Sequence, residues 1–170
     1  MSEPVVVRAA RPDDAEAIAR IHNEGIAERV ATFQTAIQQG PSIAEAIEGG
    51  RLVFVAARGD EVVGWASVAP YDDAHEYYSG VGEATLYVRR QARREGTGRA
   101  LLAALAEEAE RRGYHKLVGK IFTTNGPSIA LVRASGWREV GLHERHGRLD
   151  GEWKDVLVVE MLLGEARSGG

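Results

Sequence analysis

Residues 81–102, VGEATLYVRRQARREGTGRALL, join an apolar run to an amphipathic run through a loop with two glycines. The first eight residues are typical of a strand, and apolar residues recur at helical spacing from Leu101 as far as Gly113. Glycine destabilises a helix interior by roughly 0.5–1 kcal/mol relative to alanine, so Gly96 and Gly98 at a helix start need a reason. The segment predicts a strand, a loop of phosphate size and a helix.

The glycine spacing separates three kinds of phosphate loop. A P-loop requires four residues between its glycines and a Lys-Ser or Lys-Thr after the second, and neither is present. A dinucleotide fingerprint requires glycine or alanine three residues after Gly98, where Leu101 stands. What remains is a loop whose backbone N–H groups, from about Arg94 to Arg99, converge on an anion at a helix N-terminus. A glycine-rich helix cap with solvated arginines is the alternative.

Composition bounds the class of protein. The chain has 170 residues, 44% hydrophobic and 27% charged, which is typical of one soluble globular domain. Its net charge of −4 gives no general attraction to nucleic acid or to an anionic membrane, so neither is expected as a partner. No apolar stretch is long enough for a membrane span, and no signal peptide is visible, so a cytoplasmic location is the default expectation.

Metal chemistry is not expected either. The chain has no cysteine, and its five histidines include no spaced pair that is typical of a zinc site.

Hydrophobic periodicity and turn residues predict the remaining elements. We expect strands from Val5, at 52–58, 62–70 and 115–122, and two within 137–163, with helices from Pro12 and at 42–50 and 127–136. Two of the strand pairs read as hairpins, around Gly59-Asp60 and around Asp150-Gly151. The order mixes hairpins with crossovers, so it predicts an α+β fold with a mixed central sheet. Residues 1–164 are expected to form one domain, and 165–170 a disordered tail.

Several segments carry a family resemblance. The pattern Arg93-x-x-Gly96-x-Gly98 after an extended run resembles the GCN5-related N-acetyltransferase (GNAT) superfamily, as do RAARPDDAEAIARI at 8–21 and NGPSIALVRASGW at 125–137. The chain is more closely similar to the phosphinothricin, arsinothricin and methionine sulfoximine acetyltransferases, through RVATF at 29–33, GEATLYV at 82–88 and HGRLDGEWKDV at 146–156. The resemblance implies a mostly antiparallel, twisted sheet of about six or seven strands, flanked by about four helices.

The resemblance also implies acetyl-CoA as cosubstrate, with the coenzyme A pyrophosphate in the glycine loop and the pantetheine arm along the preceding strand. The positions that match the family's cofactor site are Leu86, Tyr87, Val88, Arg93, Arg94, Glu95, Gly96, Thr97, Gly98, Arg99, Asn125 and Ser128. From the residues alone, Asn125 reads equally well as a helix N-cap.

Glu83 lies in an otherwise uncharged strand, on the same face as Tyr87 by strand periodicity. A buried carboxylate is costly unless it has a partner or a task, although an edge-strand glutamate that reaches solvent is the alternative. By resemblance, Glu83 matches the proposed general base. That role suits the reaction, because only a neutral amine attacks a thioester and most amines are protonated at pH 7.

The family's usual acid is missing. Many relatives protonate the departing thiolate with a tyrosine from the helix after Asn125, where this chain has Val132 and no tyrosine, so the role stays unassigned.

The acceptor side departs from the resemblance. Residues 71–80, YDDAHEYYSG, carry acidic residues where phosphinothricin-type relatives carry arginine or lysine, so a phosphinate or arsonate would be repelled. The candidate substrate-binding residues are Phe33, His75, Tyr77, Tyr78 and Lys154, with Arg148 as a further source of positive charge. Phe33 reads equally well as a core residue, and the two basic residues as a solvated hairpin.

Together these features predict an acetyl-CoA-dependent N-acetyltransferase that acts on a small primary amine, an amino acid or an amino-acid-like toxin. Acetylation of a cationic amine or of a protein N-terminus is the alternative within the enzyme class. A coenzyme A-binding regulatory module without turnover is the alternative outside it. The resemblance also implies a homodimer.

Overall fold

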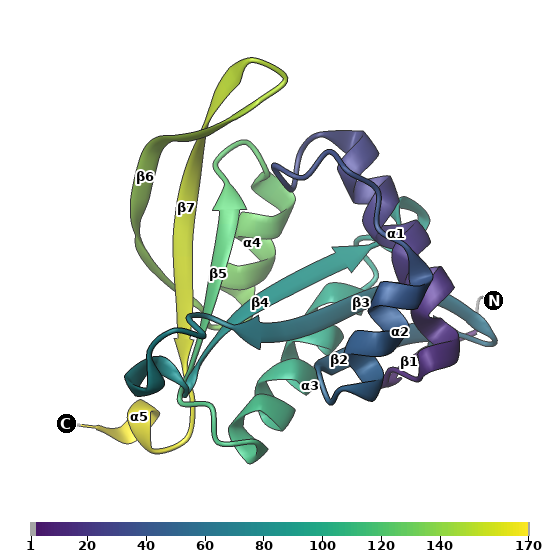
Figure 1. Cartoon of the computed structure of the whole chain (residues 1–170), viewed down its shortest axis with the longest axis horizontal. Helices are drawn as coiled ribbons and strands as arrows, with labels where there is room; N and C mark the ends of the chain where they lie inside the picture. The colour runs from purple at the N-terminus through teal and green to yellow at the C-terminus, as the bar shows by residue number, and fades with distance from the viewer. Residues whose placement is uncertain (1–2, 170) are drawn as a thin grey trace.

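The computed structural model describes residues 3–169. The first two residues of the predicted domain, Met1 and Ser2, and the last residue of the predicted tail, Gly170, lie outside this range. Within this range the chain forms a seven-stranded sheet in the order β1-β2-β3-β4-β5-β7-β6 (Figure 1). The strands are β1 Val5–Ala9, β2 Leu52–Arg58, β3 Glu61–Pro70, β4 Val81–Val88, β5 Lys116–Phe122, β6 Arg138–Leu149 and β7 Glu152–Leu162. The helices are α1 Ala15–Glu28, α2 Gly40–Glu48, α3 Thr97–Arg111, α4 Gly126–Ala134 and α5 Glu165–Ser168.

The sheet is mixed, as predicted. All neighbouring strands pair antiparallel except β4 and β5, which are parallel because α3 carries the chain across the sheet between them. The expected α+β class, with a mostly antiparallel sheet flanked by helices, is therefore confirmed.

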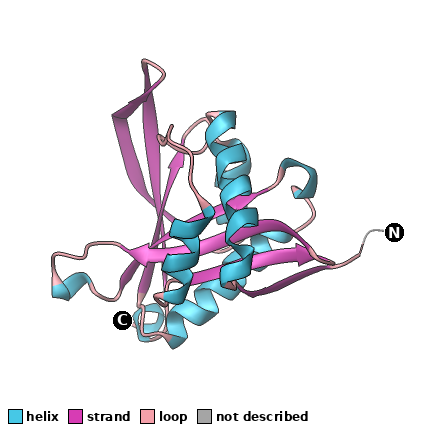
Figure 2. Cartoon of the chain, turned by 45° about the vertical axis from the view of Figure 1, so that its right-hand side comes forward, coloured by secondary structure: helices cyan, strands magenta, loops and turns pink. Residues whose placement is uncertain are grey.

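Helices cover both faces of the sheet (Figure 2). On one face α1 buries Ile18 and Ile21 against Trp65 of β3, and α2 packs Ile43 and Ile47 against the same cluster. On the other face α3 buries Leu101 and Leu105, both 0% exposed, in the cluster that also contains α4 residues. Fully burying one such leucine stabilises the fold by about 1.5–3 kcal/mol. The leucines that recur at helical spacing from Leu101 therefore form the inward face of α3.

The start of α1 differs in detail from the prediction. Pro12–Asp14 forms a 3-10 turn, and the α-helix begins only at Ala15. The Asp14 carboxylate accepts the Arg11 backbone N–H at 2.7 Å and pairs with Arg8 at 2.7 Å. The hydrogen bond from Arg8 lowers the pKa of Asp14 and thus keeps this cap ionised.

The C-terminal hairpin matches its predicted turn. Asp150 and Gly151 have φ of 50° and 83°, as a two-residue type I′ turn requires. The strands then lead to α5, a single helical turn in the segment where the sequence predicts a disordered tail. Arg167 of that turn pairs with Glu110 of α3 at 3.2 Å, a tertiary contact that local sequence does not reveal.

The two halves of the sheet separate at its centre. β4 and β5 pair at only three positions, ending with Glu83 opposite Val118, and then diverge (Figure 1). Beyond that point β4 stays paired with β3, and β5 with β7. We call this opening, between 84–88 of β4 and 119–122 of β5, the fork.

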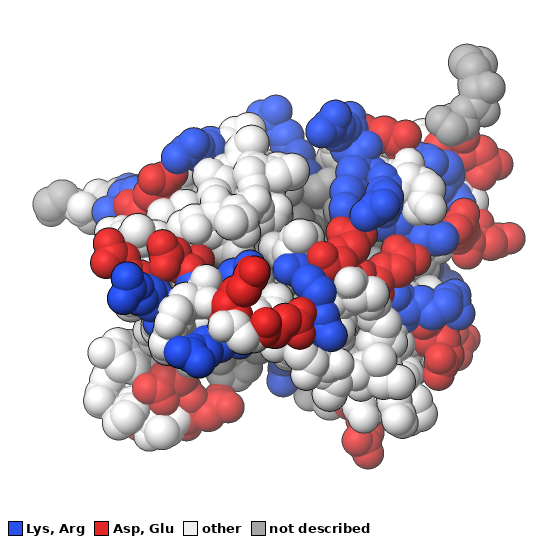
Figure 3. Space-filling model, turned by 90° about the horizontal axis from the view of Figure 1, so that it is seen from above, with Lys and Arg blue, Asp and Glu red and all other residues white. Residues whose placement is uncertain are grey.

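Positively and negatively charged side chains are interspersed over the face seen in Figure 3, and neither sign of charge forms a large patch there. Among the described residues, no helix combines the length and the apolar character needed to cross a membrane.

Candidate functional site

A cavity of about 560 Å³ occupies the fork and reaches both faces of the sheet. On the α1 and α2 face its lining includes His22, Phe33, Trp65, Glu83 and Tyr87. On the α3 and α4 face it includes Leu86, Leu102, Leu131, Val132 and Trp137. Because consecutive strand residues point to opposite faces, β4 contributes to both sides at once. A ligand on each face can therefore meet the other at the fork.

The fork also frees backbone donors. Arg89 N–H donates to the Val63 carbonyl and Tyr71 N–H donates to the Val81 carbonyl, so the odd-numbered residues of β4 direct their N–H and C=O groups toward β3. By alternation, the N–H groups of Leu86 and Val88 point toward β5, from which β4 has separated. Two N–H donors there can polarise a carbonyl oxygen.

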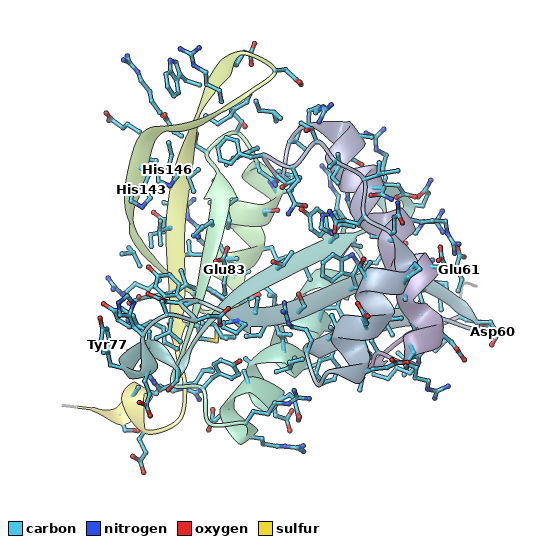
Figure 4. All side chains as sticks on the ribbon, in the orientation of Figure 1. Asp60, Glu61, Tyr77, Glu83, His143 and His146 are labelled. Carbon is cyan, nitrogen blue, oxygen red and sulfur yellow. The ribbon has the colours of Figure 1, made fainter. Side chains whose placement is uncertain are left out.

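Glu83 lies where the strands separate, and Figure 4 shows it near the middle of the sheet. Its carboxylate Oε2 is 3.2 Å from Nζ of Lys120 on β5. Both side chains line the cavity and are partly exposed, 34% for Glu83 and 46% for Lys120. The carboxylate is therefore within reach of a ligand. The alternative that Glu83 lies on an edge strand is wrong, since β4 is the central strand of the sheet.

Sequence reasoning missed Lys120. The signal was available, because Lys120 is the one charged residue within 117–122, as Glu83 is a carboxylate inside an uncharged run. What could not be seen is that the two side chains meet, since they lie 37 residues apart.

Three rings form one wall of the cavity. His22 of α1 stacks on Tyr87 and on Trp65, with ring centroids 4.8 and 5.5 Å apart. His22 Nε2 lies 2.8 Å from the Gln34 side-chain oxygen. Burial lowers the pKa of His22 and raises that of Tyr87, so both rings are held uncharged at neutral pH. The sequence reading did not single out His22.

The glycine loop has the form of an anion site. Arg94 and Gly96 both have positive φ, 65° and 82°, and the loop ends at the N-terminus of α3. Within residues 3–169, no hydrogen bond uses the backbone N–H groups of 94–99. The Thr97 side chain is 2% exposed, and its Oγ1 has no partner. Unpaired amides beside a buried, unpaired hydroxyl fit a bound phosphate.

The side chains or packing of three predicted cofactor residues also shape this loop. Arg93 donates to the Val88 carbonyl at 2.9 Å and to both oxygens of Glu28 at 3.1 Å. Glu95 pairs with Arg58. A Cβ on Gly98 would lie 2.8 Å from Leu131 Cδ2, so a larger residue there would displace the Leu131 side chain of α4. The exposed Arg94 and Arg99 form no ion pair in the described part of the chain and are available to a phosphate.

Asn125 is the N-cap of α4, which was the alternative prediction for this residue. The Asn125 side chain accepts the Ser128 backbone N–H at 3.3 Å, as an N-cap does, and both residues line the cavity. α4 contributes Leu131 and Val132 beside them.

The predicted acceptor residues divide into two groups. Phe33 lines the cavity and packs edge-on against Phe122, with centroids 4.7 Å apart. His75, Tyr77 and Tyr78 do not line it; Tyr77 is 72% exposed and lies toward the lower left of Figure 4, away from Glu83. The acidic loop therefore does not face the cavity within this chain.

The basic residues of the hairpin are engaged with neighbours. Lys154 pairs with Glu152 at 3.2 Å, and Arg148 stacks over the Trp153 ring at 4.2 Å. His146, which lies on the bulged part of β6, does line the cavity (Figure 4).

A forked mixed sheet, an anion loop at a helix start and a carboxylate at the fork define the class of acetyl-CoA-dependent N-acetyltransferases. The chain belongs to the GNAT family, since residues 7–158 match the model described as "Acetyltransferase (GNAT) domain". It is 30% identical to an L-methionine sulfoximine/L-methionine sulfone acetyltransferase of Pseudomonas paraeruginosa, over 95% of this chain and 96% of that one.

Solved structures agree with this family. A phosphinothricin acetyltransferase from Sinorhizobium meliloti in complex with acetyl-CoA superposes with a TM-score of 0.89 and 26% identity, covering 98% of this chain and 92% of that one. A ribosomal-protein-alanine N-acetyltransferase from Brucella melitensis gives a TM-score of 0.87 and 33% identity, over 93% and 99%. The protein is an enzyme of this family, with acetyl-CoA as its acetyl donor.

Proposed function

We propose that the enzyme transfers the acetyl group of acetyl-CoA to the α-amine of a small amino acid of the methionine sulfone type, with Glu83 as general base. The observation that carries this proposal is the position of Glu83, partly exposed in the cavity where β4 and β5 separate. The names of the relatives, which include a methionine sulfoximine acetyltransferase, support the acceptor class.

The coenzyme binds on the α3 and α4 face. Its phosphates contact the unpaired N–H groups of 94–99, the Thr97 hydroxyl, and the side chains of Arg94 and Arg99. Asn125 and Ser128 contact the arm that leads into the fork. The acetyl-CoA thioester supplies the activated acetyl group, and the N–H groups of Leu86 and Val88 polarise its carbonyl oxygen.

The acceptor enters from the α1 and α2 face, beside His22, Phe33 and Tyr87. Glu83 takes a proton from the ammonium group, directly or through one water, and the neutral nitrogen attacks the carbonyl carbon. A C–N bond forms, the C–S bond breaks and the electron pair leaves with sulfur. The attacking nitrogen loses its second proton, which passes through water to the departing thiolate and completes the coenzyme A thiol, while Glu83 later returns its own proton to solvent. A thiol pKa of about 8.5 makes the thiolate a tolerable leaving group.

The test is release of free thiol from acetyl-CoA over a panel of amines. L-methionine sulfone, L-methionine sulfoximine and phosphinothricin are compared with a polyamine, with a peptide that has an N-terminal alanine, and with no acceptor. We expect the amino acids to give the highest kcat/KM. Turnover with only the polyamine or the peptide would show that the acceptor class is wrong, and background rates throughout would favour a non-catalytic coenzyme A-binding module.

The peptide is included as an acceptor because the Brucella melitensis relative is named a ribosomal-protein-alanine N-acetyltransferase.

We further propose that residues 1–164 act as one domain, in a cytoplasmic homodimer. Light scattering on the purified protein is expected to give twice the 18.4 kDa chain mass. A monomer would remove the homodimer proposal.

A further inference from the structure

We propose that Lys120 binds the α-carboxylate of the acceptor, so that Glu83 and Lys120 together recognise the zwitterionic head of an α-amino acid. This inference rests on the proposed function and assigns a residue to its substrate specificity. The sequence offered no carboxylate-binding residue near the fork, since the predicted loop at 71–80 is acidic and does not line the cavity.

The two charges already stand at the right separation. Glu83 Oε2 and Lys120 Nζ are 3.2 Å apart, one on each strand of the fork. In an α-amino acid the ammonium nitrogen and the nearer carboxylate oxygens are about 3 Å apart, because only two bonds separate nitrogen from the carboxyl carbon. A zwitterion can therefore lie against the pair with its charges reversed, ammonium to Glu83 and carboxylate to Lys120.

The exposure of the pair permits such an exchange. Nearly half of the Lys120 side chain is exposed, so its ammonium can turn from Glu83 to a ligand without unpacking the core. The pair contributes little to folding for the same reason, since exposed ion pairs are weak. Within the described residues, Arg51 is the other permanent cation of the cavity lining. Lys120 is preferred to Arg51 because it already contacts the base.

The arrangement also disfavours the alternative acceptors. A polyamine or another cation without a carboxylate would bring its charge close to Lys120 with nothing to offset the repulsion. A peptide N-terminus has an amide in place of the carboxylate and meets the same difficulty. The Lys120 charge thus selects for free amino acids.

The experiment pairs a change in the protein with a change in the substrate. kcat/KM is measured for L-methionine sulfone and for its carboxamide, which lacks the carboxylate charge, in the wild type and in Lys120→Met, Lys120→Arg, Arg51→Met and Lys116→Met. Because only the acid-to-amide ratio is compared between proteins, the different amine pKa of the amide cancels. Lys116 is the matched control, since it lies on the same strand but pairs with Glu160 at 3.1 Å outside the cavity.

We expect the wild type to prefer the acid over the amide. Lys120→Met should lower the acid-to-amide ratio by about 10- to 100-fold relative to the wild type, the usual worth of a hydrogen bond between charged groups, through a higher KM for the acid. Lys120→Arg and Lys116→Met should keep most of the wild-type ratio. Calorimetry of coenzyme A binding should be unchanged in all variants, which shows that they are folded.

Two results would overturn the inference. If Lys120→Met keeps the preference, or if only Arg51→Met removes it, Lys120 does not bind the carboxylate, although the amino acid remains the acceptor. If the wild type acetylates neither substrate, the proposed function itself fails and the inference falls with it.

Discussion

Glu83 is the residue that we propose as the general base, and its position explains why an otherwise uncharged strand tolerates a carboxylate. The side chain lies at the last paired position of β4 and β5, where the sheet opens to the cavity, and Lys120 offsets part of its charge. Both a base and a charged recognition group need that exposure. A general base can be distinguished from a structural carboxylate, because the decrease in kcat on its substitution depends on pH.

Glu83→Gln is expected to lower kcat for the best acceptor by about 100-fold or more at pH 7, the usual contribution of a general base. The deficit should narrow as the pH rises toward the pKa of the amine, because a deprotonated acceptor needs no base. pH profiles of kcat measure the loss of rate and its dependence on pH. Calorimetry of coenzyme A binding checks that the variant still binds the coenzyme. Glu139→Gln, on the exposed edge strand, is the control, and an unchanged kcat in Glu83→Gln would remove the base assignment.

Among the elements, the junction of β4 with α3 is the place where we propose that the coenzyme phosphates bind. The loop between them leaves six consecutive backbone N–H groups unpaired in the described structure, from Arg94 to Arg99, at the positive end of a 15-residue helix. Its glycines have separate causes: Gly96 has positive φ, whereas Gly98 makes room for Leu131 of α4. A Gly98 substitution therefore tests packing as well as phosphate binding, and Thr97 gives the cleaner test.

Thr97→Val is expected to have opposite effects on the two states of the enzyme. The buried, unpaired Oγ1 costs stability without ligand, so replacing it with a methyl group should leave the melting temperature unchanged or higher. Loss of a hydrogen bond to phosphate should weaken coenzyme A binding by about 3- to 30-fold. Calorimetric melting and titration check both, and equal affinity in the variant would exclude Thr97 from the phosphate site.

The packing of α1 on β3 and β4 predicts a pH effect. Burial lowers the pKa of His22 in the folded state below its unfolded value, so protonation favours the unfolded chain. The stability contributed by the neutral ring is complete above the unfolded pKa of about 6.5 and is lost as the pH falls below it, toward the lower folded pKa. Urea unfolding from pH 7.5 to 5 should show this slope.

His22→Phe keeps the stack on Trp65 and Tyr87 but cannot titrate, so part of the slope should disappear in this variant. His143→Gln, on the exposed part of β6, is the control and should keep it. The same slope in His22→Phe and the wild type would contradict the assignment.

In the whole molecule, the fork divides the sheet into a β1 to β4 part and a β5 to β7 part, which share three paired positions and the α3 crossover. A ligand in the cavity contacts both parts, and the lining confirms this because it combines residues of α1, β3, β4, β5 and α4. Binding at a site shared by two parts restrains both.

Coenzyme A at 100 times its dissociation constant is expected to stabilise the fold by about 2.7 kcal/mol. That corresponds to a rise of about 5–11 °C in melting temperature for a domain of this size. Hydrogen exchange should slow at Leu86, Val88 and the amides of 94–99. Protection confined to residues outside the fork and the loop would contradict the proposed binding mode.

Much of the fold could be predicted from local patterns. The strand at 52–58 and the Asp150-Gly151 turn match their predicted positions, because alternation and positive φ leave direct marks in the sequence. The spacing of its leucines and the positions of Gly96 and Gly98 likewise predicted the Thr97–Arg111 helix. The helical turn of α5 was missed, since its ion pair comes from Glu110.

The site was predicted only in part. The sequence by itself determined the order of elements, the glycine loop at the start of α3 and the carboxylate at Glu83, because each depends on residues close together in the chain. The tertiary structure decided that Lys120 meets Glu83, that His22 stacks on Tyr87, and that the acidic loop lies away from the cavity. These relations join residues that lie far apart in the chain, so they depend on how the strands and helices pack and not on local sequence.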